Sequence, residues 1–161
     1  MRETQLLYPR RLFQLWKKGH VHEVWFWEYP RLFDKHDLAL ARSQHHVGRG
    51  GYHFGEWFTA IHFWKKGYKV LIEKYVFKEN SEKFKKASEL LDKEGMALLV
   101  ARRRDVQPPD LLVFDPRHGF FFFVEVKRER DRLGRKQKQF FSEIEKKLHC
   151  QVLIVNLRAA K

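Results

Sequence analysis

The stretch that decides the fold is "PDLLVFDPRHGFFFFVEVKRERDRLGRKQ", residues 109–137. Two apolar runs rich in strand-forming residues, 110–115 and 120–127, flank the short segment 116–119, which ends in glycine. Such a segment between two strand patterns is typical of a β-hairpin. The sequence therefore predicts an antiparallel pair of strands here.

Charged residues stand at the end of the second apolar run. Side chains alternate between the two faces of a strand, so Glu125 and Lys127 share one face. The hairpin would bring Asp110 opposite the region of Glu125, and Glu56 could add a third carboxylate. Converging carboxylates form a hard-oxygen site for Mg²⁺ or Mn²⁺. A lysine beside it could lower the pKa of a metal-bound water and offset negative charge in a transition state.

The surrounding residues predict a mixed sheet flanked by helices, an α/β or α+β fold. Helical spacing of apolar residues predicts a helix over 56–67, and Ser81 and Gly95 suggest the start and end of another. The segment 96–103 fits either a short strand or the tail of that helix. Further elements are expected as strands over 68–77 and 150–157 and as a helix over 135–149, whose inward stripe is Gln137, Phe141, Ile144 and Leu148.

The first fifty residues show a weaker pattern. Residues 11–20 fit a short helix, residues 21–30 look like a strand stopped by Pro30, and residues 43–55 are rich in turn formers. We expect the aromatic residues Trp25, Phe26 and Trp27 to lie in the core or in an oligomer interface.

Composition narrows the possible partners. The 161 residues suit one domain, and 33 Lys plus Arg against 20 Asp plus Glu give a net charge of +13. Such a field favours a polyanionic partner. We expect no membrane span, and the single Cys150 favours a reducing cytoplasm without disulfides. The histidines, including His45, His46 and His53, lack the cysteine partners and spacing of a structural zinc site.

The decisive stretch resembles the PD-(D/E)xK nuclease superfamily and, within it, the virus-type replication-repair nuclease (VRR-NUC) domain, which is also the catalytic part of the Fanconi-associated nuclease. The resemblance rests on Pro109-Asp110, on Glu125-Val126-Lys127, and on residues 131–137 at the family distances. It is specific over 109–139, looser over 55–77, and does not reach residues 1–50. It implies a restriction-endonuclease-like core over 51–161, with a helical insertion near 81–95 and an N-terminal extension over 1–50 for DNA binding or dimer formation.

The resemblance also implies roles for single residues. Asp110, Glu125 and the backbone carbonyl of Val126 would hold the metal, and Lys127 would orient or activate the attacking water. Glu56 would bind the metal directly or through water, and Gln137 would match the glutamine of the family. A hydrogen bond at the helix N-terminus is the structural alternative for Gln137. Gly134 replaces the usual serine of the family, so Asp131 would have to help start the helix.

Basic residues cluster around this stretch and predict contact with DNA. Each cluster alone would also suit a solvated surface, but two clusters, 102–104 and 127–138, flank the acids. Arg49 lies apart from them in the glycine-rich segment 45–51, which fits either a phosphate-binding loop or a plain linker. The predicted DNA-binding residues are Arg49, Arg102, Arg103, Arg104, Arg128, Arg130, Arg132, Arg135, Lys136 and Lys138.

These features together predict a divalent-metal-dependent DNA endonuclease, using Mg²⁺ or Mn²⁺. By analogy with small stand-alone domains of this kind, we expect a homodimer that cuts branched DNA such as four-way junctions. Three alternatives stay open: a flap-type nuclease, a restriction-type nuclease, and a basic DNA-binding protein that uses a nuclease fold without catalysis.

Overall fold

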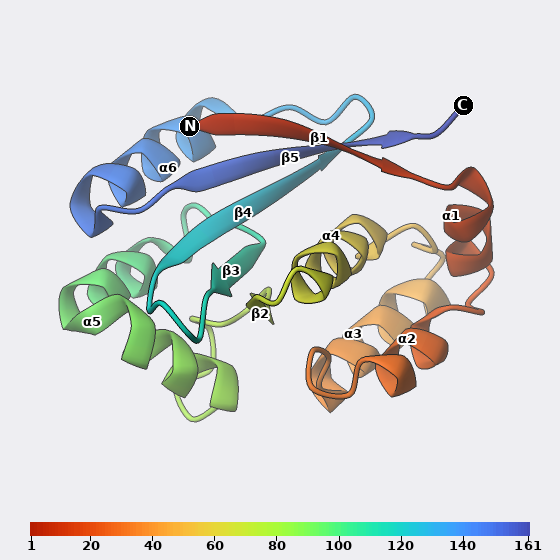
Figure 1. Ribbon diagram of the computed structural model, residues 1–161, viewed down its shortest axis with the longest axis horizontal. Coiled ribbons are helices and arrows are strands. Elements are labelled where there is room, and N and C mark those ends of the chain that lie inside the picture. Colours follow the sequence, from red (N-terminus) through yellow and green to blue (C-terminus); the bar gives the residue numbers. More distant parts are fainter.

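The computed structural model describes residues 1–161 and contains a sheet of five strands with six helices (Figure 1). The fold is α+β, and the predicted class, a mixed sheet flanked by helices, is confirmed. Along the chain the elements are β1 (Arg2–Tyr8), α1 (Arg10–Lys17), α2 (His22–Glu28), α3 (Lys35–His46), α4 (Phe54–Lys65), β2 (Lys69–Ile72), α5 (Glu82–Arg102), β3 (Leu111–Phe114), β4 (Phe121–Arg128), α6 (Arg135–Leu148) and β5 (Val152–Ala159).

The strand order in the sheet is β1-β5-β4-β3-β2. The predicted hairpin is present: β3 and β4 are antiparallel, and their register pairs Leu111 with Val124. β2 joins β3 in antiparallel fashion, while β5 lies parallel to both β4 and β1. β1 and β2 are therefore the two edge strands of the sheet.

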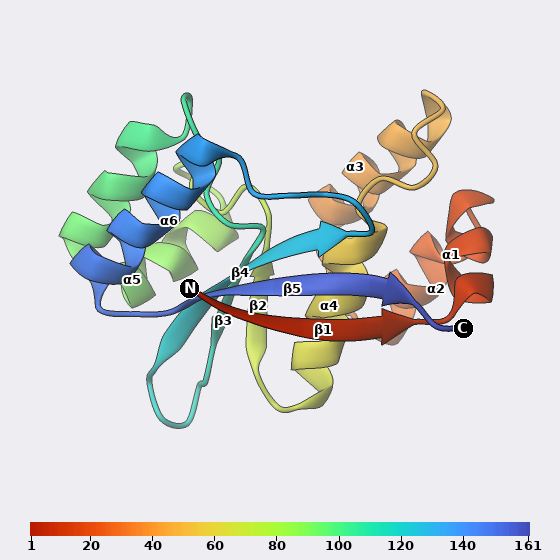
Figure 2. The ribbon, with the colours of Figure 1, turned by 90° about the horizontal axis from the view of Figure 1, so that it is seen from above.

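Helices cover both faces of the sheet, and alternating side chains supply a core to each face. Leu111 and Val124 belong to the core beneath α4 and the N-terminal helices. Leu112 and Phe123, one position along each strand, belong to the core beneath α5 and α6. Figure 2 shows α5 and α6 together on one side of the molecule and α1, α2 and α3 on the other.

The structure corrects the prediction for residues 21–30, which form helix α2 and no strand. Val21 and Trp25 are buried, while Val24 and Trp27 are exposed, so the apolar residues follow helical spacing. Trp25 packs against Trp16 with ring centroids 5.5 Å apart. The aromatic and β-branched residues suggested a strand, but tertiary packing decides the conformation.

Strand β1 and helix α3 are further elements that the sequence did not reveal. β1 has no apolar alternation, because most of its residues are exposed at the sheet edge, and it is held by pairing with β5. Helix α3 begins with a capping box, in which Asp34 accepts from the backbone of Asp37 and Asp37 accepts from the backbone of Asp34.

Two predicted boundaries shift. Helix α5 begins after its predicted cap Ser81, but it continues past Gly95 to Arg102, which settles the ambiguous segment 96–103 as helix. Asp92 has a φ of 58° and interrupts the helix, and its side chain accepts from the backbone N–H of Gly95. The strand predicted over 68–77 ends at Ile72, because Glu73 and Lys74 take positive φ values.

Residues 1–50 and 51–161 share one core. Trp16 is fully buried and lies 5.3 Å from Trp57 between ring centroids, and Phe33 stacks on Trp57 at 3.8 Å. The division into an N-terminal extension over 1–50 and a nuclease core over 51–161 stays a prediction. None of the helices combines the length and apolar composition needed to cross a bilayer.

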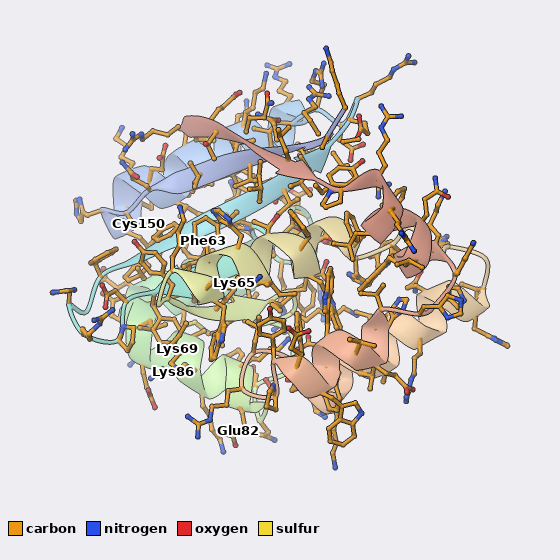
Figure 3. All side chains as sticks on the ribbon, turned by 45° about the vertical axis from the view of Figure 1, so that its right-hand side comes forward. Phe63, Lys65, Lys69, Glu82, Lys86 and Cys150 are labelled. Carbon is orange, nitrogen blue, oxygen red and sulfur yellow. The ribbon has the colours of Figure 1, made fainter.

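Figure 3 labels Lys69 on β2, Lys86 on α5 and Cys150. Nζ of Lys69 lies 4.4 Å from the ring centroid of Trp64, and Nζ of Lys86 lies 5.2 Å from the ring centroid of Phe114. The edge strand β2 therefore carries a lysine, a residue that disfavours pairing with a further strand. Cys150 forms no disulfide, and burial raises the pKa of its thiol to about 12.

Candidate active site

Three acidic residues lie level with one another across β2, β3 and β4. The register pairs Ile72 with Leu111 and Leu111 with Val124, so the next position on each strand holds Glu73, Asp110 or Glu125. The backbone N–H of Glu73 donates to the carbonyl of Asp110 at 2.7 Å. The backbone N–H of Asp110 donates to Oε2 of Glu125 at 3.3 Å. We call these three residues the acid row.

The segment that carries Asp110 is fixed on both sides. The backbone N–H of Val126 donates to Oδ2 of Asp110 at 2.8 Å. The buried hydroxyl of Tyr75 donates to the carbonyl of Pro109 at 2.6 Å. The structure therefore places Asp110 opposite Glu125, where the hairpin pattern predicts it. Val126 lies two residues beyond the last pair of the β3–β4 ladder.

Lys127 and Gln137 both contact the carboxylate of Glu125. Nζ of Lys127 lies 2.8 Å from Oε1 of Glu125, and Nε2 of Gln137 donates to the same oxygen at 3.2 Å. Oε1 of Gln137 accepts from Nζ of Lys127 at 3.4 Å and from the backbone N–H of Gly134 at 3.1 Å. Gln137 thus contacts Glu125 and Lys127 and also caps the N-terminus of α6, while its role in a metal site stays a prediction. Asp131 plays no part in this cap: its Oδ2 accepts from the N–H of Arg128.

Glu56 reaches the acid row from the first turn of α4. The preceding residue, Gly55, lies tightly against the sheet: a Cβ there would lie 3.0 Å from methyl carbons of both Leu157 and Val126. This close approach brings the N-terminus of α4 to the ends of the strands. Burial, followed by the charges of Glu73 and Glu125, raises the pKa of Glu56 to about 8.

The electrostatics of the acid row favour binding of a proton or a cation. Burial, followed by the charges of Glu125 and Glu56, raises the pKa of Asp110 well above its ordinary value. Burial also raises the pKa of Glu125, against the opposing effect of Lys127. For Lys127 burial alone would lower the pKa, but the charges of Glu125 and Asp110 outweigh it and raise the pKa. The lysine is therefore an ammonium group at neutral pH.

His53 and Glu73 join this site although the sequence did not single them out as a pair. Nδ1 of His53 lies 2.8 Å from Oε2 of Glu73. The predicted strand ran to residue 77 and placed Glu73 inside it, whereas the strand ends at Ile72 and leaves the acid at its end. Glu73 could not be found from the sequence, because the sequence pattern does not show that β2 ends at Ile72. His53 had no sequence signal beyond its place three residues before Glu56.

Two cavities border the acids, and Tyr52 lines both of them. One has a volume of about 290 Å³ and is lined by Tyr52, Glu73 and Asp110, among others. The other, of about 580 Å³, is lined by Tyr52, Glu56 and the bases Lys17, Arg49 and Arg128. Glu73 and Asp110 therefore border one cavity and Glu56 borders the other.

The predicted DNA-binding residues differ in their surroundings. Arg49 and Arg128 line the cavity beside Glu56, and the guanidinium of Arg128 lies 4.2 Å from the ring centroid of Phe13. Arg102 pairs with Glu143 at 2.8 Å, and Arg103 donates to the carbonyl of Val76, so both are held within the fold. Arg132 donates to the carbonyl of Asp131, and Lys136 pairs with Asp105. Six of the predicted bases are exposed: Arg104, Arg130, Arg132, Arg135, Lys136 and Lys138.

The sequence profile of the VRR-NUC domain matches residues 57–158, more than half of the chain. The chain therefore belongs to the VRR-NUC family, a class of nuclease domains. The matched segment contains all three residues of the acid row as well as Lys127 and Gln137, and it begins one residue after Glu56.

Among solved structures, the chain is similar to paFAN1 in a crystal structure with a 5′-flap DNA that carries a 2-nucleotide flap and a gap. The identity is 19%, the TM-score is 0.38, and the alignment covers 79% of this chain and 25% of that chain. The chain thus spans about a quarter of the length of paFAN1. Comparison with curated proteins finds no match.

Proposed function

We propose that the protein is a divalent-metal-dependent DNA endonuclease that cuts branched DNA, with four-way junctions as the preferred substrate. One observation carries the proposal: Asp110 and Glu125 lie level on adjacent strands, and the ammonium of Lys127 lies 2.8 Å from Glu125. Convergent carboxylates beside a cation suit hydrolysis of a phosphodiester.

The donors at this site fit Mg²⁺ or Mn²⁺. Carboxylate oxygens of Asp110 and Glu125, with the backbone carbonyl of Val126, would hold the ion, and Glu56 would bind it directly or through water. These are hard oxygen donors, the kind that both ions prefer. When bound, the ion would lower the pKa of a coordinated water and neutralise charge on the phosphate.

The position of Lys127 beside Glu125 suggests its role. Lys127 would orient or activate the attacking water, and its ammonium would stabilise negative charge on the phosphate oxygens. Gln137 contacts both Glu125 and Lys127 and would hold the two in register. Removing Gln137 would loosen this geometry without removing a charge.

DNA would reach the acids through the cavity lined by Arg49 and Arg128, and the exposed bases of the segment 130–138 would hold the neighbouring phosphates. The remaining predicted bases would extend this surface. A homodimer would present two such sites for paired cuts on opposite strands of a junction, and the free edge of β1 is one place where a second copy could add its own strand.

The test is a cleavage assay of the full chain on supercoiled, linear, flap and four-way-junction DNA, with Mg²⁺, Mn²⁺ or EDTA. We expect cutting with either ion and none with EDTA, with the junction cut fastest. Asp110→Asn and Lys127→Ala should each lose at least about 100-fold in rate, the typical loss when a charge-stabilising group is removed. Both variants should still bind DNA, because the phosphate-contacting bases remain.

Lys85→Ala, an exposed lysine of α5 on another part of the surface, is the matched control and should cut at the wild-type rate. Unchanged cutting by both Asp110→Asn and Lys127→Ala would refute the site. Wild-type binding without cutting under every ion would instead identify a DNA-binding protein without catalysis. Faster cutting of the flap than of the junction would identify a flap-type nuclease.

A further inference from the structure

A histidine and two glutamates gather at the β2 end of the acid row. A ring nitrogen of His53 and one carboxylate oxygen each of Glu56 and Glu73 all lie within 4.8 Å of one another. Lys127 stands at the other end of the row, where it pairs with Glu125. The cluster therefore shares Glu56 with the proposed site at Asp110 and Glu125, but it lies at the end of the row away from Lys127 and adds a nitrogen donor.

His53 combines a buried side chain, a left-handed backbone and an unpaired ring nitrogen. Its side chain is 2% exposed, and the residue takes a φ of 65° at the N-terminus of α4. Nδ1 contacts Glu73, but Nε2 is buried and has no hydrogen-bond partner. Buried polar atoms are normally paired, so this imidazole has unused binding capacity. The left-handed backbone is also costly for a histidine.

The two glutamates lack a fixed counter-charge. Glu56 forms no salt bridge, and the partner of Glu73 is His53, which carries charge only when protonated. Arg128 lines the cavity beside Glu56 but forms no salt bridge with it. Two carboxylates beside an imidazole, without a lysine or arginine to neutralise them, leave the cluster suited to a divalent cation.

We propose that His53, Glu56 and Glu73 form a second divalent-cation site, separate from the one at Asp110 and Glu125. Because Glu56 is near both sites, it links them. The imidazole nitrogen makes this site more favourable for Mn²⁺ than for Mg²⁺, since nitrogen donors suit first-row transition metals and Mg²⁺ prefers oxygen. The ion at Asp110 and Glu125 belongs to the proposed function, and to that extent the inference rests on it. The second site does not depend on cleavage and can be tested without DNA.

The test counts Mn²⁺ bound to the metal-free full chain by titration calorimetry and detects nitrogen ligands by electron spin-echo envelope modulation. We expect two Mn²⁺ in the wild type, with nitrogen modulation from one of them. Glu73→Gln and His53→Asn should each bind one Mn²⁺, and His53→Asn should lose the nitrogen signal. Asparagine tolerates the left-handed backbone, so it tests the ligand and spares the conformation.

Asp110→Asn separates this inference from the proposed function. It should lose the first Mn²⁺ and keep the nitrogen-coupled one, whatever its effect on cleavage. The exposed Glu79→Gln is the matched control and should bind two, and circular dichroism should show the same fold for every variant. A wild type that binds one Mn²⁺ without nitrogen modulation, or a nitrogen signal that survives in His53→Asn, would overturn the proposal.

Discussion

At the scale of single residues, the site is defined by an imbalance of charge. The acid row and Glu56 bring four carboxylates together, while Lys127 is the single lysine or arginine that forms a salt bridge with any of them. Asp110, Glu125, Lys127 and Gln137 could be found from the sequence, because they lie in one continuous stretch with a hairpin register. Glu73 and His53 could not, because their place depends on where β2 ends and how α4 begins.

The titration of Glu56 gives a prediction for the metal-free protein. Its pKa rises from 4.5 to about 8 in the fold. A group with a raised pKa in the fold stabilises it below its unfolded value near 4.5, and this stabilisation is lost as the pH rises through about 8. In EDTA, the melting temperature of the wild type should therefore fall across this range, and that of Glu56→Gln should fall less.

We expect the two melting curves to diverge by at least about 3 °C, the shift that about 1 kcal/mol produces in a chain of this size. Thermal denaturation followed by circular dichroism measures it, with Glu79→Gln as the control. Parallel pH profiles for wild type and Glu56→Gln would show that Glu56 titrates normally.

At the scale of elements, the geometry of the proposed site depends on how closely α4 approaches the sheet. Gly55 has no Cβ, and its contacts with Val126 and Leu157 set the distance. The sequence predicted α4 and the hairpin, because their apolar spacing and turn residues agree with the final fold. It missed α2, whose aromatic residues suggested a strand, because burial of Trp25 against Trp16 decides the conformation.

Gly55→Ala tests this approach. The new methyl group would press on two buried side chains in a filled core, which typically costs about 1–3 kcal/mol. We expect a lower melting temperature, reported by circular dichroism, and a slower cleavage rate, because α4 would carry Glu56 away from the strands.

Gly134→Ser is the control for this substitution. A side chain there has nothing within 4 Å, and serine is a good first residue for a helix, so stability should be unchanged or slightly raised. Wild-type stability and cleavage in Gly55→Ala would show that this contact does not position Glu56.

At the scale of the whole molecule, one sheet ties the N-terminal segment to the site. β1 extends the sheet beside β5, and the N-terminal helices cover the face opposite α5 and α6 (Figures 1 and 2). The sequence placed a boundary near residue 50, because the family pattern does not reach further. It could not show that Trp16 and Phe33 pack on Trp57, since these contacts join residues far apart in the chain.

Removing residues 1–50 should therefore unfold the remainder. A chain of residues 51–161 would expose Phe54 and Trp57 and leave β5 without β1. We expect no cooperative thermal transition by circular dichroism and poor dispersion in a nitrogen–proton NMR spectrum. The full chain, prepared in the same way, is the control. A cooperative transition in the shortened chain would establish residues 51–161 as an independently folding domain.

The acid row also bears on how long the protein survives. Without a bound ion, the carboxylates of the acid row would repel one another at the place where the pairing of β2, β3 and β4 ends, and weakly held segments open locally more often than the rest of a fold. Proteases cut such opened segments, and an ion that binds only the closed form suppresses the opening. If the proposed metal site is correct, removal of divalent ions would thus shorten the lifetime of the protein.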